Sequence, residues 1–164
     1  MFGGSFNPPH KMHLNISKEL LKKRYLDKII YLPTGASYVK NGLISFKDRF
    51  NMVKLMIEDY DYLYVSDIGD FDNFKYTYQT LDYFNNNKDE IYFICGTDNL
   101  AELDTWMKYK YILEKYKEYK NNIIITNIES KKISSTIIRN KLKVNKSNLN
   151  KLVYDYIISK GIYR

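Results

Sequence analysis

The sequence predicts one α/β domain over residues 1–164, built on a doubly wound parallel sheet of about five strands, with a small helical part from about residue 134 onward. Two observations support this fold class. Short β-branched or aromatic runs alternate with longer runs of helical periodicity, and this alternation is typical of βαβ units with right-handed crossovers. The chain has the length of one ordinary domain, and no repeat or linker divides it.

The first strand is the unusual element. Met1 and Phe2 run directly into Gly3 and Gly4, so this strand is either very short or begins upstream of Met1. In a doubly wound sheet it should lie centrally, where a strand is buried on both faces. We therefore expect a few more apolar, β-branched residues before Met1 in the natural protein.

The remaining elements follow from residue type and spacing. Strands are expected where β-branched and aromatic residues cluster and a turn residue follows. In chain order these runs are 28–32, 62–65, 91–95 and 123–126. Helices are expected where apolar residues recur every three or four positions. These runs are 14–21, 46–57, 78–84, 100–116 in one or two pieces, 135–142 and 149–158.

Composition excludes several classes of protein. Hydrophobic residues make up 45% and charged residues 27% of the chain, which is ordinary for a globular protein. The apolar runs are too short to span a bilayer, and the N-terminus has no signal-peptide pattern, so a cytoplasmic location is expected. The single cysteine, Cys95, excludes a disulfide framework.

The net charge of +7 has two interpretations. Lys is enriched together with Asn, Tyr and Ile, a pattern that indicates biased nucleotide composition rather than selection for a basic surface. No block of five basic residues occurs. We therefore interpret the lysines as a solvated coat rather than a nucleic-acid interface, and the charge also suits a small anionic substrate.

The first motif is the N-terminal segment Gly3-Gly4-Ser5-Phe6-Asn7-Pro8-Pro9-His10-Lys11-Met12-His13. Gly3 and Gly4 permit a positive φ and the close backbone approach that a phosphate requires. The following helix would present free N–H groups and its positive dipole end to an anion. His10 and His13 are three residues apart, so on a first helical turn they lie on one face.

This segment has three other interpretations. A histidine near a helix start is often a cap or a surface residue. Two histidines on one face are also zinc-ligand spacing, but His10 and His13 are the only histidines, and Cys95 belongs to a predicted buried strand. The loop matches neither the P-loop nor the dinucleotide-binding pattern.

The second motif is Ile133-Ser134-Ser135-Thr136-Ile137-Ile138-Arg139. Ser134 or Ser135 is a natural N-cap. Arg139 follows Ser135 by four residues and so lies on the same helix face. Hydroxyls, helix N–H groups and a guanidinium aimed one way would hold a polyphosphate, although a capped helix with a surface arginine would give the same pattern.

Together, the two motifs resemble the nucleotidyltransferase superfamily with HxGH-like and ISSTxxR motifs, and most closely its nicotinate- or nicotinamide-nucleotide adenylyltransferases. Four further segments carry the resemblance along the whole chain. They are residues 33–44 with Arg49 beyond them, Tyr76-Thr77-Tyr78-Gln79-Thr80-Leu81, Gly96-Thr97-Asp98-Asn99-Leu100 with Trp106, and residues 152–163. The resemblance implies a Rossmann-like sheet with ATP across the switch point at the strand C-termini.

The resemblance also implies a reaction and a set of site residues. AMP would pass from ATP to a pyridine mononucleotide, releasing pyrophosphate, with Mg²⁺ held mainly by the ATP phosphates. The implied catalytic residues are His10, His13, Lys40 and Arg139. The implied ATP-binding residues are Gly3, Gly4, Ser5, Phe6, His10, His13, Gly96, Asp98, Ile133, Ser134, Ser135, Thr136 and Arg139. The implied pyridine-nucleotide residues are Asn7, Lys40, Thr77, Thr80 and Trp106. Trp106 could instead anchor the core, and Lys40 could be a surface lysine.

Some features depart from the family pattern or leave alternatives open. Met12 replaces the glycine usual in the bacterial HxGH form, and Tyr154 stands where a proline is common. Phosphopantetheine adenylyltransferase is the alternative with the same fold; a catalytically silent nucleotide-binding or RNA-binding regulator is the alternative of another class. The expected partners are ATP and a pyridine mononucleotide, without nucleic acid or membrane. The sequence leaves open a homo-oligomer and the choice between nicotinate and nicotinamide.

Overall fold

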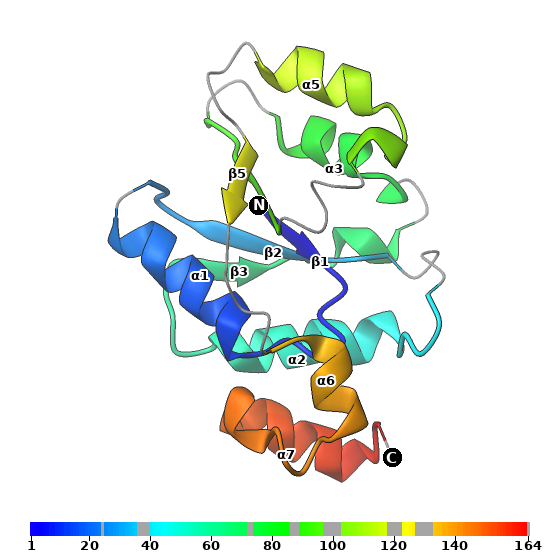
Figure 1. The fold of residues 1–164 in the computed structure, drawn as a ribbon. Helices are drawn as coiled ribbons and strands as arrows, with labels where there is room; N and C mark the ends of the chain where they lie inside the picture. The colour runs from blue at the N-terminus through cyan, green and yellow to red at the C-terminus, as the bar shows by residue number, and fades with distance from the viewer. Residues whose placement is uncertain are drawn as a thin grey trace.

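The protein is a five-stranded parallel sheet covered by helices on both faces (Figure 1). The structure is a computed structural model that describes residues 1–23, 25–35, 40–71, 74–85, 89–96, 103–117, 123–126 and 133–163. The strands are β1 (Phe2–Gly4), β2 (Ile29–Pro33), β3 (Leu63–Val65), β4 (Phe93–Gly96) and β5 (Ile123–Thr126). Their spatial order, β3-β2-β1-β4-β5, is that of a doubly wound sheet with its switch point between β1 and β4. The predicted fold class is confirmed.

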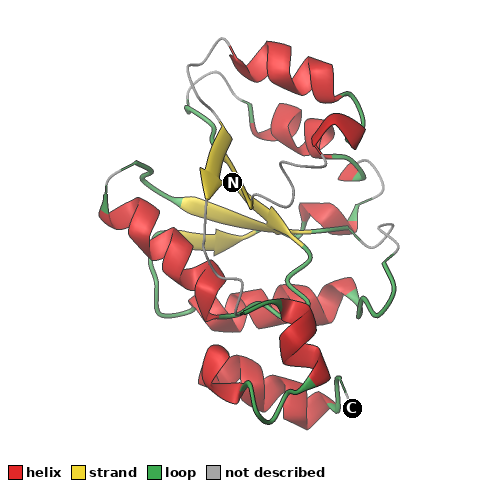
Figure 2. Ribbon diagram, in the orientation of Figure 1, coloured by secondary structure: helices red, strands yellow, loops and turns green. Residues whose placement is uncertain are grey.

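The helices form a layer on each side of the sheet (Figure 2). They are α1 (Lys11–Lys22), α2 (Phe46–Ile57), α3 (Thr77–Phe84), α5 (Tyr109–Lys117), α6 (Ser135–Asn140) and α7 (Lys151–Lys160), with 3-10 turns at η1 (Ile68–Asp70), η3 (Leu103–Thr105) and η4 (Lys146–Asn148). One core cluster joins α1, α2, α6 and α7 to one face, and a smaller cluster joins α3 and α5 to the other. In Figure 1, α7 lies outside α2, so α2 is buried between α7 and the sheet.

β1 lies at the centre of the sheet, as predicted. Phe2 pairs with Tyr31 of β2 on one side and with Ile94 of β4 on the other. Met1 and Phe2 are only 8% and 5% exposed, because strands and helices surround them. Three residues are therefore enough to pair with both neighbouring strands.

The expected role of Gly3 and Gly4 needs correction. Neither has a positive φ. A Cβ on Gly3 would lie 2.9 Å from Cζ of Phe93, and one on Gly4 would lie 3.1 Å from Cζ of Phe6. These glycines therefore make room for aromatic rings against the strand, and Phe6, with φ of 46°, takes the left-handed conformation instead.

Most predicted elements are confirmed within a few residues. The helix predicted over 46–57 matches α2 at both ends. Ser45 caps its N-terminus by accepting a bond from the Asp48 amide at 3.1 Å. The helical run predicted over 100–116 is seen as η3 and α5, separated by Lys108 with φ of 57°; residues 100–102 lie outside the described residues. No helix in the described parts of the chain is long and apolar enough to cross a membrane.

Candidate active site

The loop between β1 and α1 follows the central strand at the switch point of the sheet. Its residues Phe6, Asn7 and His10 are only 1%, 3% and 6% exposed. Phe6 packs edge-on against His13 and Tyr31, with ring centroids 5.0 and 5.4 Å apart. This packing holds Phe6 in its strained backbone conformation and so fixes the course of the loop.

His10 and His13 meet at the start of α1, as their spacing predicts. His10 is the N-cap of the helix, and its amide N–H donates to Nδ1 of His13 at 3.1 Å. The two rings stack with centroids 3.8 Å apart. Because Nδ1 of His13 accepts this bond, the ring proton of a neutral His13 is on Nε2. His13 therefore carries an N–H donor on the far side of its ring.

Both imidazoles are held in the neutral form. Burial lowers the pKa of His10 to about 4. Burial and the neighbouring His10 lower the pKa of His13 well below its ordinary value. Among the described residues, Nδ1 of His10 is the one buried side-chain nitrogen or oxygen without a hydrogen-bond partner. An unpaired buried polar atom is costly, by about 1–3 kcal/mol, and such atoms are typical of sites that bind a ligand.

A hydroxyl pair supports the helix turn that carries His13. The hydroxyls of Ser17 and Tyr31 lie 2.6 Å apart, and they lie 3.3 and 3.2 Å from the carbonyl oxygen of His13. Since each hydroxyl has one proton, one of them donates to the other, and the second donates to this carbonyl. Burial raises the pKa of Tyr31, so its hydroxyl remains a donor at neutral pH. No local pattern in the sequence indicates this support, because Tyr31 belongs to β2 and Ser17 to α1.

Arg49 of α2 is a fully buried cation beneath the loops that follow β1 and β2. It donates to the carbonyls of Ser5, Thr34 and Ile44 at 3.0, 2.7 and 3.1 Å, and to the Thr34 hydroxyl at 3.1 Å. None of the ion pairs between described residues involves Arg49. Burial lowers the pKa of its guanidinium, which nevertheless stays charged in proteins. Its positive charge favours an anion above the loop.

The second motif packs directly against the first. Ser134 caps α6 by accepting a bond from the Ile137 amide at 3.2 Å, which confirms the predicted cap. The Ser135 hydroxyl donates to the carbonyl of Pro8 at 2.8 Å. Arg139 donates to the Asn7 carbonyl at 2.6 Å and to the Thr136 hydroxyl at 3.1 Å. These two bonds use two of the five N–H donors of Arg139.

Asn7 joins the first loop to two other segments. Its Nδ2 donates to the carbonyl of Gly42 at 2.8 Å. Its Oδ1 accepts from the Tyr163 hydroxyl at 2.6 Å and from the Ile44 amide at 3.4 Å. The side chain that the resemblance assigned to the pyridine nucleotide is thus engaged in bonds within the protein.

The other residues expected at the pyridine nucleotide come from α3, from the segment before α5 and from the loop after β2. Thr77 begins α3, Thr80 lies one turn along it, and Trp106 packs edge-on against Phe93 with centroids 5.7 Å apart. Lys40 is exposed. No hydrogen bond or ring contact between described residues joins these side chains to His10 or His13. Asp98 lies outside the described residues, and of Gly96 only the backbone in β4 is described.

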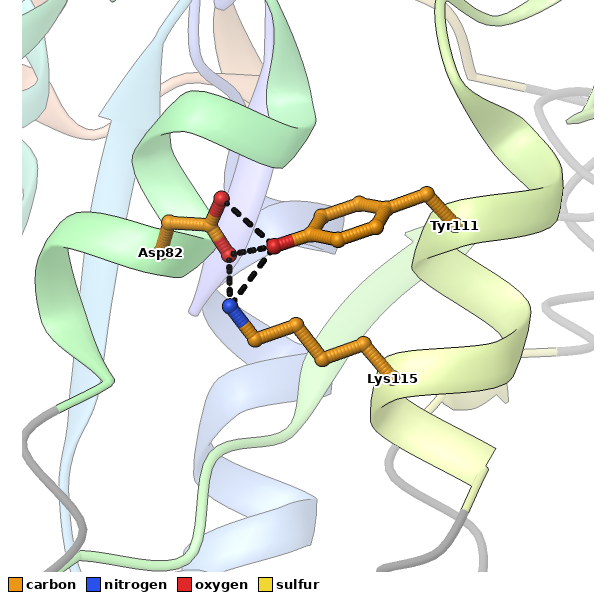
Figure 3. A network of polar contacts seen from close by, with 3 residues as sticks. All are labelled: Asp82, Tyr111 and Lys115. Atoms are coloured by element: carbon orange, nitrogen blue, oxygen red, sulfur yellow. Dashed lines mark hydrogen bonds and ion pairs between the residues drawn. The ribbon is translucent and has the colours of Figure 1, made fainter.

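A polar network connects α3, the helix that contains Thr77 and Thr80, to α5 (Figure 3). The Tyr111 hydroxyl lies 3.1 and 3.0 Å from the two carboxylate oxygens of Asp82. Nζ of Lys115 lies 2.7 Å from both Asp82 and the Tyr111 hydroxyl. This network fixes the relative position of the two helices that cover this face of the sheet.

Known proteins resemble this chain over its whole length. Residues 1–141 match the family model described as cytidylyltransferase-like. The chain is 34% identical to a probable nicotinate-nucleotide adenylyltransferase of Acholeplasma laidlawii (strain PG-8A), with 99% of this chain and 96% of the relative covered. It is 35% identical to a protein of the same description from Staphylococcus haemolyticus (strain JCSC1435), with 99% and 95% covered.

The fold is also shared with solved structures. The Plasmodium falciparum nicotinic acid mononucleotide adenylyltransferase complexed with NaAD superimposes with a TM-score of 0.80 at 19% identity, covering 99% of this chain and 95% of that one. A putative nicotinate-nucleotide adenylyltransferase from Vibrio parahaemolyticus gives a TM-score of 0.78 at 22% identity, with 99% and 93% covered.

Proposed function

Because the chain belongs to the cytidylyltransferase-like family and to the nicotinate-nucleotide adenylyltransferases, we propose that it transfers AMP from ATP to nicotinate mononucleotide, giving the dinucleotide and pyrophosphate in NAD biosynthesis. One structural observation supports this most directly. A stacked pair of neutral histidines follows the central strand, and Arg139 is bonded to the same loop. Hydrogen-bond donors thus converge at the switch point, where doubly wound sheets bind nucleotides.

The reaction requires alignment more than acid–base chemistry. A phosphate oxygen of the mononucleotide attacks the α-phosphorus of ATP, and the bond from that phosphorus to the pyrophosphate oxygen breaks. The attacking phosphate is already ionised at neutral pH, so it needs no general base. Charge on the α-phosphate and on the departing pyrophosphate must be stabilised by fixed donors.

The two histidines are suited to that role in their neutral form. His13 holds its proton on Nε2 through the bond from the His10 amide, and Nε2–H would donate to the α-phosphate as charge develops there. Through its unpaired Nδ1, His10 would either donate to an adjacent phosphate oxygen or accept from a water bound to the phosphates. The field of Arg49 below the loop adds to the attraction for both substrates.

The triphosphate would bind between the first loop and α6. Gly3, Gly4, Ser5 and Phe6 would form the floor of this region. Ile133, which packs against the core cluster, would lie at its edge. The remaining donors of Arg139, the Thr136 hydroxyl and the α6 amides would hold the β- and γ-phosphates. Ser134 contributes as the cap of α6, and Ser135 by fixing the helix to Pro8. Gly96 and Asp98 would contact the adenosine.

The pyridine nucleotide would bind on the α3 side of the switch point. Thr77 and Thr80 would donate to its phosphate or carboxylate, Trp106 would stack on its ring, and Lys40 would approach its phosphate. Asn7 would shape this pocket through its bonds to neighbouring segments rather than through a free amide.

Mg²⁺ fits this site only as a companion of ATP. Within the described residues, no group of three or more His, Cys, Asp or Glu side chains could hold a metal ion. Mg²⁺ often keeps several waters and binds chiefly through substrate phosphates. We therefore propose that the ion arrives on ATP and lowers the charge of the triphosphate, and that the protein holds it indirectly.

The experiment is a turnover assay with purified chain, ATP and four separate acceptor conditions. The acceptors are nicotinate mononucleotide, nicotinamide mononucleotide, phosphopantetheine and none, with pyrophosphate release and chromatographic product analysis as readouts. We expect dinucleotide formation with the nicotinate acceptor at a higher kcat/KM than with the amide. If phosphopantetheine were adenylylated and neither mononucleotide were, the result would favour a phosphopantetheine adenylyltransferase. ATP binding without any turnover would favour a silent regulator.

A further inference from the structure

Tyr163 lies against the first loop although it comes from the C-terminal segment. Gly161, with φ of 64°, ends α7, and Tyr163, with φ of 61°, turns back toward the sheet. Its hydroxyl donates to Oδ1 of Asn7 at 2.6 Å, joining residues 156 positions apart. The ring is partly buried and packs against the core cluster that contains Phe6.

This hydroxyl provides the better of the two bonds to Asn7 Oδ1. The other donor, the Ile44 amide, lies at 3.4 Å, near the limit of a hydrogen bond. Asn7 is 3% exposed, so water has little access to replace a lost donor. Without the Tyr163 hydroxyl, the Asn7 side chain would keep its donor bond to Gly42 and lose its main acceptor bond.

The position of Asn7 affects both catalytic motifs. His10 follows Asn7 by three residues, two of which are prolines that make the segment stiff. The Asn7 carbonyl also accepts the bond from Arg139. A shift of Asn7 would therefore move the imidazoles and the guanidinium relative to one another.

We propose that Tyr163 is a positioning residue for adenylyl transfer, whose hydroxyl fixes Asn7 and thereby aligns His10, His13 and Arg139. This inference rests on the proposed function. Burial raises the pKa of the Tyr163 hydroxyl, so it stays protonated and able to donate at the pH of the assay. A misplacement of reacting groups by a fraction of an ångström to 1 Å lowers turnover by about ten- to a hundredfold.

The test compares Tyr163→Phe with Tyr156→Phe. Tyr156 is a matched control, because its hydroxyl also joins the C-terminal part to the rest of the protein, donating to Asp48 at 2.8 Å and accepting from Asn51 at 3.2 Å. Both variants lose one hydroxyl and keep the ring. We expect Tyr163→Phe to lower kcat about tenfold with smaller changes in both KM values. Tyr156→Phe should lower the melting temperature similarly and leave kcat within about twofold.

A double-mutant cycle with Asn7→Ala shows whether the hydroxyl acts through Asn7. We expect Tyr163→Phe to have less than about a twofold effect on kcat/KM in the Asn7→Ala background. The same cycle on the urea unfolding free energy of the ligand-free chain gives a readout that needs no turnover. Two outcomes would overturn the inference: equal effects of Tyr163→Phe on kcat/KM in both backgrounds, or equal kcat values for Tyr163→Phe and Tyr156→Phe. In either case, turnover by the wild-type chain would still support the proposed function. An inactive wild-type chain would refute both.

Discussion

The guanidinium of Arg139 donates a hydrogen bond to the carbonyl oxygen of Asn7 across 2.6 Å, joining positions 132 residues apart. The two motifs that carry the proposed chemistry are therefore in contact in the protein alone. Ligand binding does not have to bring them together from a distance. The donors are preorganised, which is the condition under which electrostatic stabilisation of a transition state is most effective.

Arg139→Lys should impair ATP binding and turnover. An ammonium cannot both hold the Asn7 carbonyl and present a planar fork to a phosphate. We expect kcat/KM for ATP to fall by about ten- to a hundredfold, or about 1.4–2.7 kcal/mol of transition-state stabilisation. Steady-state kinetics with ATP as the varied substrate measures this. Exposed Lys143→Arg is the control, and an unchanged KM for ATP in Arg139→Lys would refute the predicted phosphate contact.

His13→Asn should distinguish the two roles of His13, which accepts a bond from the His10 amide at Nδ1 and is proposed to donate from Nε2 in catalysis. The Asn side chain can accept the His10 amide in place of Nδ1 but has no group at the position of Nε2. We expect a melting temperature close to the wild type and a kcat lower by at least about a hundredfold, or about 3 kcal/mol. His13→Gln, which places an amide near Nε2, should retain more activity than His13→Asn. Unfolding of His13→Asn, or near-normal turnover, would show that His13 is structural.

The buried histidines should make stability fall as the pH is lowered from neutrality. The ordinary pKa is 6.5, and the pKa of His10 in the folded protein is about 4. The unfolded chain therefore binds protons before the folded chain does, so the free energy of unfolding decreases from about pH 6.5 down to pH 4. Each imidazole contributes up to about 1.4 kcal/mol per pH unit.

Urea unfolding at pH 7, 6 and 5 measures this slope. His10→Gln should reduce it by about a third, because His13 and the N-terminal ammonium of Met1, whose pKa burial lowers to about 5, still contribute to it. Asp48 provides an internal contrast. The pKa of Asp48 is lowered from its ordinary value of 3.8, chiefly by the Ser45 hydroxyl. Its contribution to the free energy of unfolding is therefore lost only as the pH falls below 3.8. A slope that is the same in His10→Gln and wild type would contradict the pKa of His10.

Arg49→Lys should destabilise the protein. Lys has three donors on one nitrogen and cannot reach the carbonyls of Ser5, Thr34 and Ile44 together, which leaves buried carbonyls unpaired. We expect the free energy of unfolding to fall by about 2–3 kcal/mol, measured by urea unfolding at pH 7.5. The control is Lys54→Arg, the reciprocal exchange at an exposed position of the same helix. It should change the free energy of unfolding by less than about 0.5 kcal/mol. A similar small effect for Arg49→Lys would mean that water replaces the guanidinium.

Asp82→Asn should affect the pyridine nucleotide more than ATP. The Asp82 and Lys115 side chains are 33% and 38% exposed, so their ion pair contributes little to stability, below about 1 kcal/mol. Its loss would, however, loosen α3 against α5 beside Thr77 and Thr80. We expect a KM for nicotinate mononucleotide that rises severalfold while the KM for ATP is unchanged. Exposed Asp155→Asn is the control, and parallel changes in both KM values would argue against a local effect.

Local patterns in the sequence were sufficient for much of this architecture. Apolar spacing predicted α2, and the spacing of His10 and His13 predicted their meeting on one turn. Features that depend on distant packing were not predicted. Phe6 takes a positive φ because rings from β1 and β2 hold it, whereas sequence reasoning assigned that freedom to Gly3 and Gly4.

The same limit applies to the residues that support the site. Arg49 is buried because the loops after β1 and β2 converge on it, and the contact of Tyr163 with Asn7 depends on how α7 packs against α2. Both residues belong to segments that carry the family resemblance, but no spacing in the sequence indicates the contacts that they make. Contacts between segments far apart in sequence become visible only in the folded structure.

The bond between Asn7 and Tyr163 also bears on the order in which the protein forms during synthesis. Asn7 leaves the ribosome 156 residues before Tyr163, an interval on the order of ten seconds at typical elongation rates of about 5–20 residues per second. In that interval the nascent chain can pair β1 with β2 and then with β4, but the loop after β1 still lacks its last hydrogen-bond donor. During synthesis, the bond from Tyr163 is therefore the last of the Asn7 contacts that can form.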